Sequence, residues 1–116
     1  MLLVEDEPRV RAQARRLLER CGYVVIEAAE GAEGERQFRQ HSGDVDVIVT
    51  DVVMPVLGGV EMVARLRAEA PEVPVVFVSG FTAEDRDLPL DDRTAFVPKP
   101  YTIATLCDAI AGVVAG

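Results

Sequence analysis

The chain has no tryptophan, and its 116 residues include only four phenylalanines and two tyrosines. A hydrophobic core must therefore be built mainly from aliphatic side chains. Because 49% of the residues are apolar, there is enough apolar surface for one core at this length. We expect a single domain over residues 1–116.

Cysteine and histidine are also scarce. Cys21 and Cys107 lie far apart and form no CxxC pattern, so the sequence shows neither a disulfide framework nor a zinc site. We interpret both as small apolar residues that face the core. His41 is the single histidine, which excludes a histidine-based catalytic triad and a multi-histidine metal site.

Basic residues are outnumbered, with 12 Lys and Arg against 20 Asp and Glu and a net charge of −8. Such a chain repels phosphate backbones and anionic lipids, so we expect no direct contact with nucleic acid or membrane. The sequence shows no secretory signal and no apolar run of membrane-spanning length, which predicts a cytoplasmic location. Because Met1 directly precedes an apolar strand-like run, we expect this sequence to be a piece of a longer protein.

Strand-like and helix-like segments alternate along the chain. β-branched apolar runs predict strands, and apolar residues at helical spacing predict helices. This alternation predicts an α/β fold with a parallel sheet and helices on both sides. Between residues 81 and 94, Pro89 and several aspartates oppose a long helix, so we expect a short helical turn or a loop there. The predicted strands are 1–4, 23–28, 45–51, 73–80 and 94–99, and the predicted helices are 8–21, 31–43, 59–70 and 102–116.

Polar side chains follow four of these strands at the point where each strand ends. Because the carboxyl ends of parallel strands meet at one edge of a sheet, we expect these side chains to gather there. Clustered carboxylates need a counter-charge, which Mg²⁺ or a lysine supplies, and an aspartate among them can act as a nucleophile toward phosphorus. The acids after the first strand also suit the start of the first helix. The residues are Glu5, Asp6, Asp51, Ser79 and Lys99.

Lys99 is the only lysine, since the other basic residues are all arginine. An ammonium group acts as a compact point charge on a phosphate, which a broad guanidinium does not. Pro98 and Pro100 flank Lys99 and restrict the backbone around it. We therefore interpret Lys99 as a functional residue rather than a solvated surface lysine.

Four segments together resemble the receiver domain of two-component response regulators, and they run through the whole chain in the order of that family. The resemblance implies a (βα)₅ doubly wound, flavodoxin-like fold with five parallel strands in the order 2-1-3-4-5. The composition of residues 81–94 adds the expectation that the fourth helix is short or degenerate. The segments are "LLVEDEP", "IVTDVVMP", "VVFVSG" and "FVPKP".

The resemblance also assigns a phosphorylation and metal site. It implies that Asp51 is the phosphoacceptor and that Asp6 binds Mg²⁺ directly. Glu5 would act mainly through water, and Asp51 together with the backbone carbonyl of Val53 would complete the protein ligands. These roles are implied by the matching motif positions.

The same resemblance assigns a conformational switch. Lys99 would contact the phosphoryl group, and its bond to Pro100 would be cis. Ser79 would be the hydroxyl that moves toward the phosphate, and Phe96 the aromatic side chain that moves inward on activation. Phosphorylation would then alter the surface around the fourth and fifth strands.

Such a domain accepts its phosphoryl group from a phosphohistidine on a histidine kinase or a histidine phosphotransfer domain. It catalyses its own Mg²⁺-dependent phosphorylation, and apolar Val53 and Phe81 predict slow self-dephosphorylation. "VSGF" and "PKPY" resemble receivers carried by hybrid sensor histidine kinases, so the chain would then belong to a protein histidine kinase. A stand-alone regulator is the alternative, and a weak homodimer is a possible assembly.

Three other readings compete with this one. An aspartate-nucleophile phosphatase needs an acid two residues after the nucleophile, where this chain has Val53. A flavin-binding module needs a phosphate-binding loop after the first strand, where this chain has acids. A pseudo-receiver that only binds partners, independently of phosphorylation, stays open as the alternative function. Gly58, where the family often has an acid, is a departure from the receiver pattern.

Overall fold

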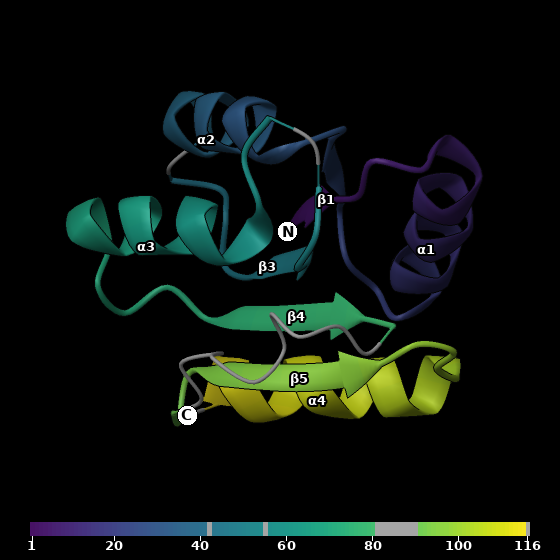
Figure 1. Cartoon of the computed structure of the whole chain (residues 1–116). Helices are drawn as coiled ribbons and strands as arrows, with labels where there is room; N and C mark the ends of the chain where they lie inside the picture. Colours follow the sequence, from purple (N-terminus) through teal and green to yellow (C-terminus); the bar gives the residue numbers. More distant parts are fainter. Residues whose placement is uncertain (42, 55, 81–90, 116) are drawn as a thin grey trace.

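The computed structural model describes residues 1–41, 43–54, 56–80 and 91–115, and these hold five strands and four helices. Strands and helices alternate from residue 2 to residue 79 and again from residue 94 to residue 115, as the sequence predicts (Figure 1). The strands are β1 (Leu2–Val4), β2 (Ile26–Ala28), β3 (Ile48–Asp51), β4 (Val75–Ser79) and β5 (Thr94–Pro98). The helices are α1 (Pro8–Arg20), α2 (Gly31–Gln40), α3 (Gly59–Glu69) and α4 (Ile103–Ala115).

The five strands form one parallel sheet in the order β2-β1-β3-β4-β5. β1 pairs with both β2 and β3, so the strand order reverses beside β1. This is the doubly wound order that the resemblance implies, and the expectation is confirmed. In folds of this kind ligands bind at the carboxyl edge of the sheet near that reversal. A ligand site is therefore expected at the ends of β1 and β3.

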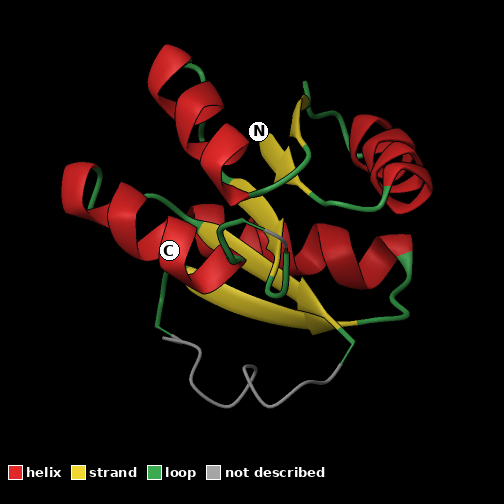
Figure 2. Cartoon of the chain, turned by 45° about the horizontal axis from the view of Figure 1, so that its top comes forward, coloured by secondary structure: helices red, strands yellow, loops and turns green. Residues whose placement is uncertain are grey.

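Helices cover both faces of the sheet, as Figures 1 and 2 show. α2 and α3 pack on one face around Phe38, Met62 and Leu66, whereas α1 and α4 pack on the other face around Leu18 and Ile110. β4 contributes to both cores, because alternate side chains of a strand point to opposite faces. All five residues of β4 are buried, as the apolar run in the sequence predicts.

Local sequence signals set the ends of α1. Pro8 occupies the first turn, where its missing N–H leaves no helical hydrogen bond unmade. The Glu7 carboxylate accepts a hydrogen bond from the backbone N–H of Arg9 at 3.3 Å and caps the helix. Gly22 follows the helix with φ of 95°, a left-handed conformation that glycine adopts without steric cost. The helix therefore starts directly after the acids that follow β1 in the sequence.

Some predicted boundaries are too wide. The predicted strands 23–28 and 45–51 are limited to Ile26–Ala28 and Ile48–Asp51. Among the described strands, β2 pairs only with the three-residue β1, and β3 extends over the residues that pair with β1 and β4. The predicted short or degenerate fourth helix falls largely on residues 81–90, which lie outside the described residues. Among the described residues, no helix combines the length and the apolar character that crossing a membrane requires.

The interpretation of the two cysteines as separate core residues is wrong. Cys21 ends α1, Cys107 lies in α4, and the structure joins their sulfurs in a disulfide with a Cα–Cα separation of 6.5 Å. The two residues are 86 positions apart in sequence, so only the packing of α1 beside α4 brings them together. Both are half-buried rather than fully enclosed in the core.

Candidate functional site

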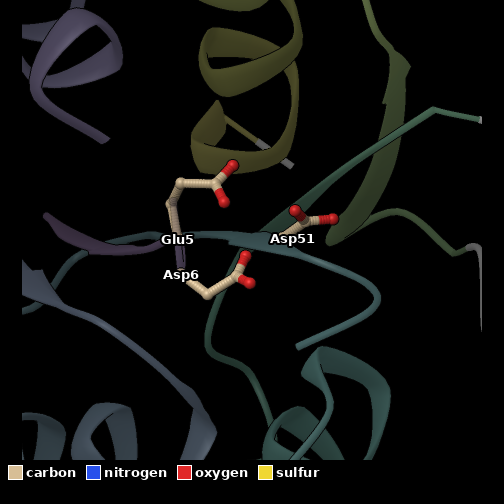
Figure 3. Close-up of side chains that lie close together, drawn as sticks. All are labelled: Glu5, Asp6 and Asp51. Atoms are coloured by element: carbon tan, nitrogen blue, oxygen red, sulfur yellow. The ribbon is translucent and has the colours of Figure 1, made fainter. Parts of the chain in front are cut away.

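Three carboxylates from two neighbouring strand ends form a cluster at the carboxyl edge of the sheet. Glu5 and Asp6 follow β1 and Asp51 ends β3, and an oxygen of each lies within 4.8 Å of the others. Figure 3 shows the three side chains close together. The gathering of acids that the sequence predicts is therefore present at the switch in strand order.

Glu5 is the buried member of this cluster, with 5% of its surface exposed. Its backbone N–H donates to the carbonyl of Ala28, and its own carbonyl accepts from the Arg11 guanidinium at 2.8 Å. Its carboxylate accepts from the N–H of Glu7 at 3.1 Å and from Lys99 Nζ at 2.8 Å. These contacts fix a carboxylate that burial alone would disfavour.

Asp51 is half-buried, and its two carboxylate oxygens have different partners. Oδ1 accepts a hydrogen bond from the N–H of Val52 at 2.8 Å, and Oδ2 accepts one from Lys99 Nζ at 3.1 Å. The backbone carbonyl of Asp51 accepts from Thr50 Oγ1 at 2.9 Å. The carboxylate is thus held in one orientation at the open edge of the sheet.

Lys99 is the cation of the site and bridges Glu5 and Asp51. Burial, the largest single effect, lowers the pKa of Lys99, but the contacts with Glu5 and Asp51 together outweigh it. The pKa of Lys99 is therefore raised above its ordinary value, and the ammonium group stays charged at neutral pH. Lys99 lies between Pro98 and Pro100, and its ammonium group contacts Asp51, the acid that ends β3.

Asp6 is exposed, and its environment opposes its charge. Burial of its carboxylate raises the pKa of Asp6, and a hydrogen bond with Glu5 and repulsion from the same residue raise it further. The neighbouring Lys99 only partly offsets this. Three carboxylates against one ammonium group leave the cluster short of positive charge.

The donor set suits a small divalent cation. Carboxylate oxygens are hard ligands, which Mg²⁺ prefers, and Mg²⁺ usually binds through one or two carboxylates while it keeps several waters. Asp6 is exposed and Asp51 is half-buried, so water can reach both, and the raised pKa of Asp6 marks a place where added positive charge is favourable. Asp6 and Asp51 are therefore the side chains that would hold the ion, with Glu5 beside them.

This charge imbalance predicts that Mg²⁺ stabilises the fold and that Asp6→Asn removes the effect. At about ten times the dissociation constant, linkage gives about 1.4 kcal/mol, which is roughly 5 °C in Tm for a domain of this size. Since the folded chain raises the pKa of Asp6, its charged form costs stability above that pKa, and Asn should raise the Tm of the metal-free domain at pH 7.

The measurement is a thermal melt at pH 7 with and without Mg²⁺ for both chains. Asp108→Asn, which removes an exposed acid of α4 outside the cluster, is the control and should keep the full Mg²⁺ shift. A Mg²⁺ shift of the same size in Asp6→Asn would contradict this role for the cluster.

Three other predicted residues lie around the cluster. Ser79 ends β4, next to the Val78 that pairs with Asp51, and only 1% of its surface is exposed. Phe96 lies in β5 opposite Phe77 and packs partly buried against the core on the α2 and α3 face. Val53, two residues after Asp51 in sequence, is 48% exposed. The switch roles of Ser79 and Phe96, and the ligand role of the Val53 carbonyl, stay predictions.

Two further expectations concern the backbone and a neighbour of the site. The Lys99–Pro100 bond is cis, as the resemblance implies. Phe81, which the sequence analysis links to slow loss of the phosphoryl group, lies outside the described residues.

Two residues that support the site, Gly59 and Arg11, were not identified from the sequence. Gly59 approaches the backbone of Asp51 so closely that a Cβ there would lie 1.9 Å from the Asp51 carbonyl oxygen. Arg11 contacts the Glu5 carbonyl and also forms an ion pair with Glu27 at 3.4 Å. The pair Gly58-Gly59 after β3 was a visible signal of a close backbone approach, whereas Arg11 is one of five arginines in its segment and carried no distinguishing signal.

A groove opens beside Lys99 between α1 and the segment that follows β5. It has a volume of about 410 Å³. Burial raises the pKa of Tyr101, whose side chain forms part of its wall. Its lining residues are Val10, Gln13, Leu17, Lys99, Pro100 and Tyr101.

Comparison with known proteins gives one consistent family. A family model described as response regulator receiver domain matches residues 1–111. The sensor kinase CckA of Brucella abortus is 42% identical over 113 residues, which cover 95% of this chain. The chain spans 12% of the length of that sensor kinase.

Solved structures give the same result. The receiver domain from the hybrid histidine kinase CckA superimposes with a TM-score of 0.81 at 34% identity, covering 97% of this chain and 96% of that one. A response regulator receiver domain protein from Clostridium thermocellum superimposes with a TM-score of 0.90 at 28% identity, covering 98% of this chain and 92% of that one.

Proposed function

The chain belongs to the response regulator receiver domain family of two-component signalling, and on that premise we propose that it accepts a phosphoryl group on Asp51. The observation that carries the proposal is the contact of the single lysine with the acid that ends β3. Lys99 Nζ lies 3.1 Å from Asp51 Oδ2, in a cluster with Glu5 and Asp6. The acids, the acceptor and the cation that the chemistry needs are therefore adjacent.

The proposed reaction is a transfer from a phosphohistidine to Asp51. A carboxylate oxygen of Asp51 attacks phosphorus, an O–P bond forms, and the N–P bond to the donor histidine breaks as that ring leaves. Lys99 supplies positive charge beside the oxygens of the moving group, and Val52 N–H orients the carboxylate by its bond to Oδ1. A bound Mg²⁺ supplies further neutralisation of phosphoryl charge.

The proposed donor is a histidine kinase or a histidine phosphotransfer domain in the cytoplasm. Similarity to the receiver of CckA supports a place as the receiver of a hybrid sensor histidine kinase. The acidic balance of the chain argues against direct contact with nucleic acid. The apolar side chain of Val53, exposed two residues after Asp51 in sequence, supports slow self-dephosphorylation.

The test is intact mass after incubation with Mg²⁺ and acetyl phosphate, for wild type and for Asp51→Asn. Wild type should gain one phosphoryl group, and the gain should disappear in Asp51→Asn and when Mg²⁺ is chelated. Addition to both chains would show that Asp51 is not the acceptor. No addition to a folded wild-type chain would favour the phosphorylation-independent pseudo-receiver.

A further inference from the structure

The two cysteines are placed for a covalent bond between helices on the same face of the sheet. Cys21 is the residue at which α1 ends, and Cys107 lies in the second turn of α4. Their Cα atoms are 6.5 Å apart, within the range that disulfides span, and the structure joins the two sulfurs. The pair shares no residue with the acidic cluster.

Packing holds both cysteines in place independently of the bond between them. The N–H of Cys21 donates to the carbonyls of Leu17 and Leu18, so its backbone is part of the helix end. Leu18 and Leu106, which directly precedes Cys107, are fully buried in the same core. The reduced thiols would therefore already face one another in the folded domain, which favours closure within one chain over bonds between chains.

Both cysteines are half-buried rather than enclosed in the core, so part of each residue is open to solvent in the folded domain. We propose that Cys21 and Cys107 form a reversible disulfide site that cross-links α1 to α4 in response to the thiol–disulfide balance of the surroundings. The oxidant is a low-molecular-weight disulfide such as oxidised glutathione.

The reaction proceeds in two exchange steps. One cysteine thiolate attacks a sulfur of the reagent and releases one reagent thiol, leaving a mixed disulfide on the protein. The second cysteine thiolate attacks the protein sulfur of that mixed disulfide and releases the other reagent thiol. The protein loses two protons and two electrons, and the reagent takes them up and is reduced to two thiols.

The cross-link acts on both stability and shape. It closes a loop across 86 positions, and closing a long loop restricts the unfolded chain. It also ties α1, whose Leu17 lines the groove beside Lys99, to α4, which begins two residues after Tyr101 of the opposite wall. Oxidation therefore restrains α1 and α4 next to the proposed phosphorylation site without changing the acidic cluster.

The experiment combines intact mass and thermal melting across a series of reduced and oxidised glutathione. After oxidation and alkylation of remaining thiols under native conditions, wild type should be 2 Da lighter, carry no alkyl group and stay monomeric. Its Tm should exceed that of the reduced chain by roughly 10 °C. Reduction with a dithiol should restore both the mass and the lower Tm.

Cys21→Ser and Cys107→Ser are the matched variants and should show neither the internal mass loss nor the redox-dependent Tm. Comparison of oxidised with reduced wild type needs no variant, so poor folding of a serine variant leaves the test intact. The proposal is overturned if the native chain keeps two alkylatable thiols at the most oxidising poise, if it forms disulfides only between chains, or if oxidation leaves the Tm unchanged. The test uses no phosphodonor, so its result is independent of the proposed function.

Discussion

Replacing Lys99 by methionine is expected to slow phosphoryl addition to Asp51 by roughly 100-fold, the scale of losing one charge-stabilising group in an active site. The ammonium group lies 2.8 Å from Glu5 and 3.1 Å from Asp51, and methionine keeps an unbranched side chain, one atom shorter, without the charge. Arginine restores the charge but not the compact contact, so Lys99→Arg should fall between wild type and methionine. The measurement is the rate of mass gain with acetyl phosphate and Mg²⁺.

Two controls separate chemistry from stability and from net charge. Arg16→Met removes one positive charge from an exposed position on α1 and should leave the rate within about twofold, because screened surface charges act weakly at a distance. Melting curves establish that each chain is folded at the assay temperature, since removing Lys99 leaves the buried Glu5 carboxylate without its cation. An unchanged rate in a folded Lys99→Met chain would remove Lys99 from the proposed mechanism.

Replacing Gly59 by alanine is expected to destabilise the domain by about 3 kcal/mol and to abolish most phosphoryl addition. A Cβ at this position would lie 1.9 Å from the Asp51 carbonyl oxygen and 3.1 Å from Thr50 Oγ1. The first of these atoms belongs to backbone, so the end of β3 must shift, and Asp51 must shift with it. Chemical unfolding measures the free energy of unfolding, and the mass assay with acetyl phosphate measures phosphoryl addition to Asp51.

Gly112→Ala is the matched control for this change. It makes the same substitution on exposed α4, where a Cβ would meet nothing within 4 Å. Alanine is the better helix former, so this variant should gain about 0.5–1 kcal/mol. If Gly59→Ala were as stable and as readily phosphorylated as Gly112→Ala, the close approach at Gly59 would be irrelevant to the site.

The fold was predictable because its signals are local and periodic. The apolar run of β4, and the helical spacing of apolar residues around Leu18 in α1 and around Leu66 in α3, can each be read within a short stretch of sequence. Leu18 and Leu66 are both fully buried in the structure. The strand ends followed from the same kind of stretch, so the polar residues after them could be assigned to one edge. The limits of β2 and β3 could not be predicted in this way, because they depend on how far each strand pairs with its neighbours in the sheet.

The residues that make up the site were easier to predict than the contacts between them. Glu5 and Lys99 are 94 positions apart, and nothing in the sequence distinguishes a direct ion pair from a contact through water. The predicted role of Glu5, which is to contact Mg²⁺ mainly through water, stays a prediction, and the burial of Glu5 against Lys99 is a contact that its motif position did not indicate. The Cys21–Cys107 pair was missed for the same reason, because it depends on how α1 and α4 lie against each other.

The single lysine also makes this site chemically addressable. Since every other basic side chain is arginine, a reagent selective for side-chain amines has one target, and that target bridges Glu5 and Asp51. An acyl group on Lys99 would remove the cation from the acceptor, so protection of this amine by ligands or partners can be followed as a footprint of site occupancy. Acetylation of the same nitrogen would remove the positive charge that Lys99 places between Glu5 and Asp51, and would leave both carboxylates unmodified.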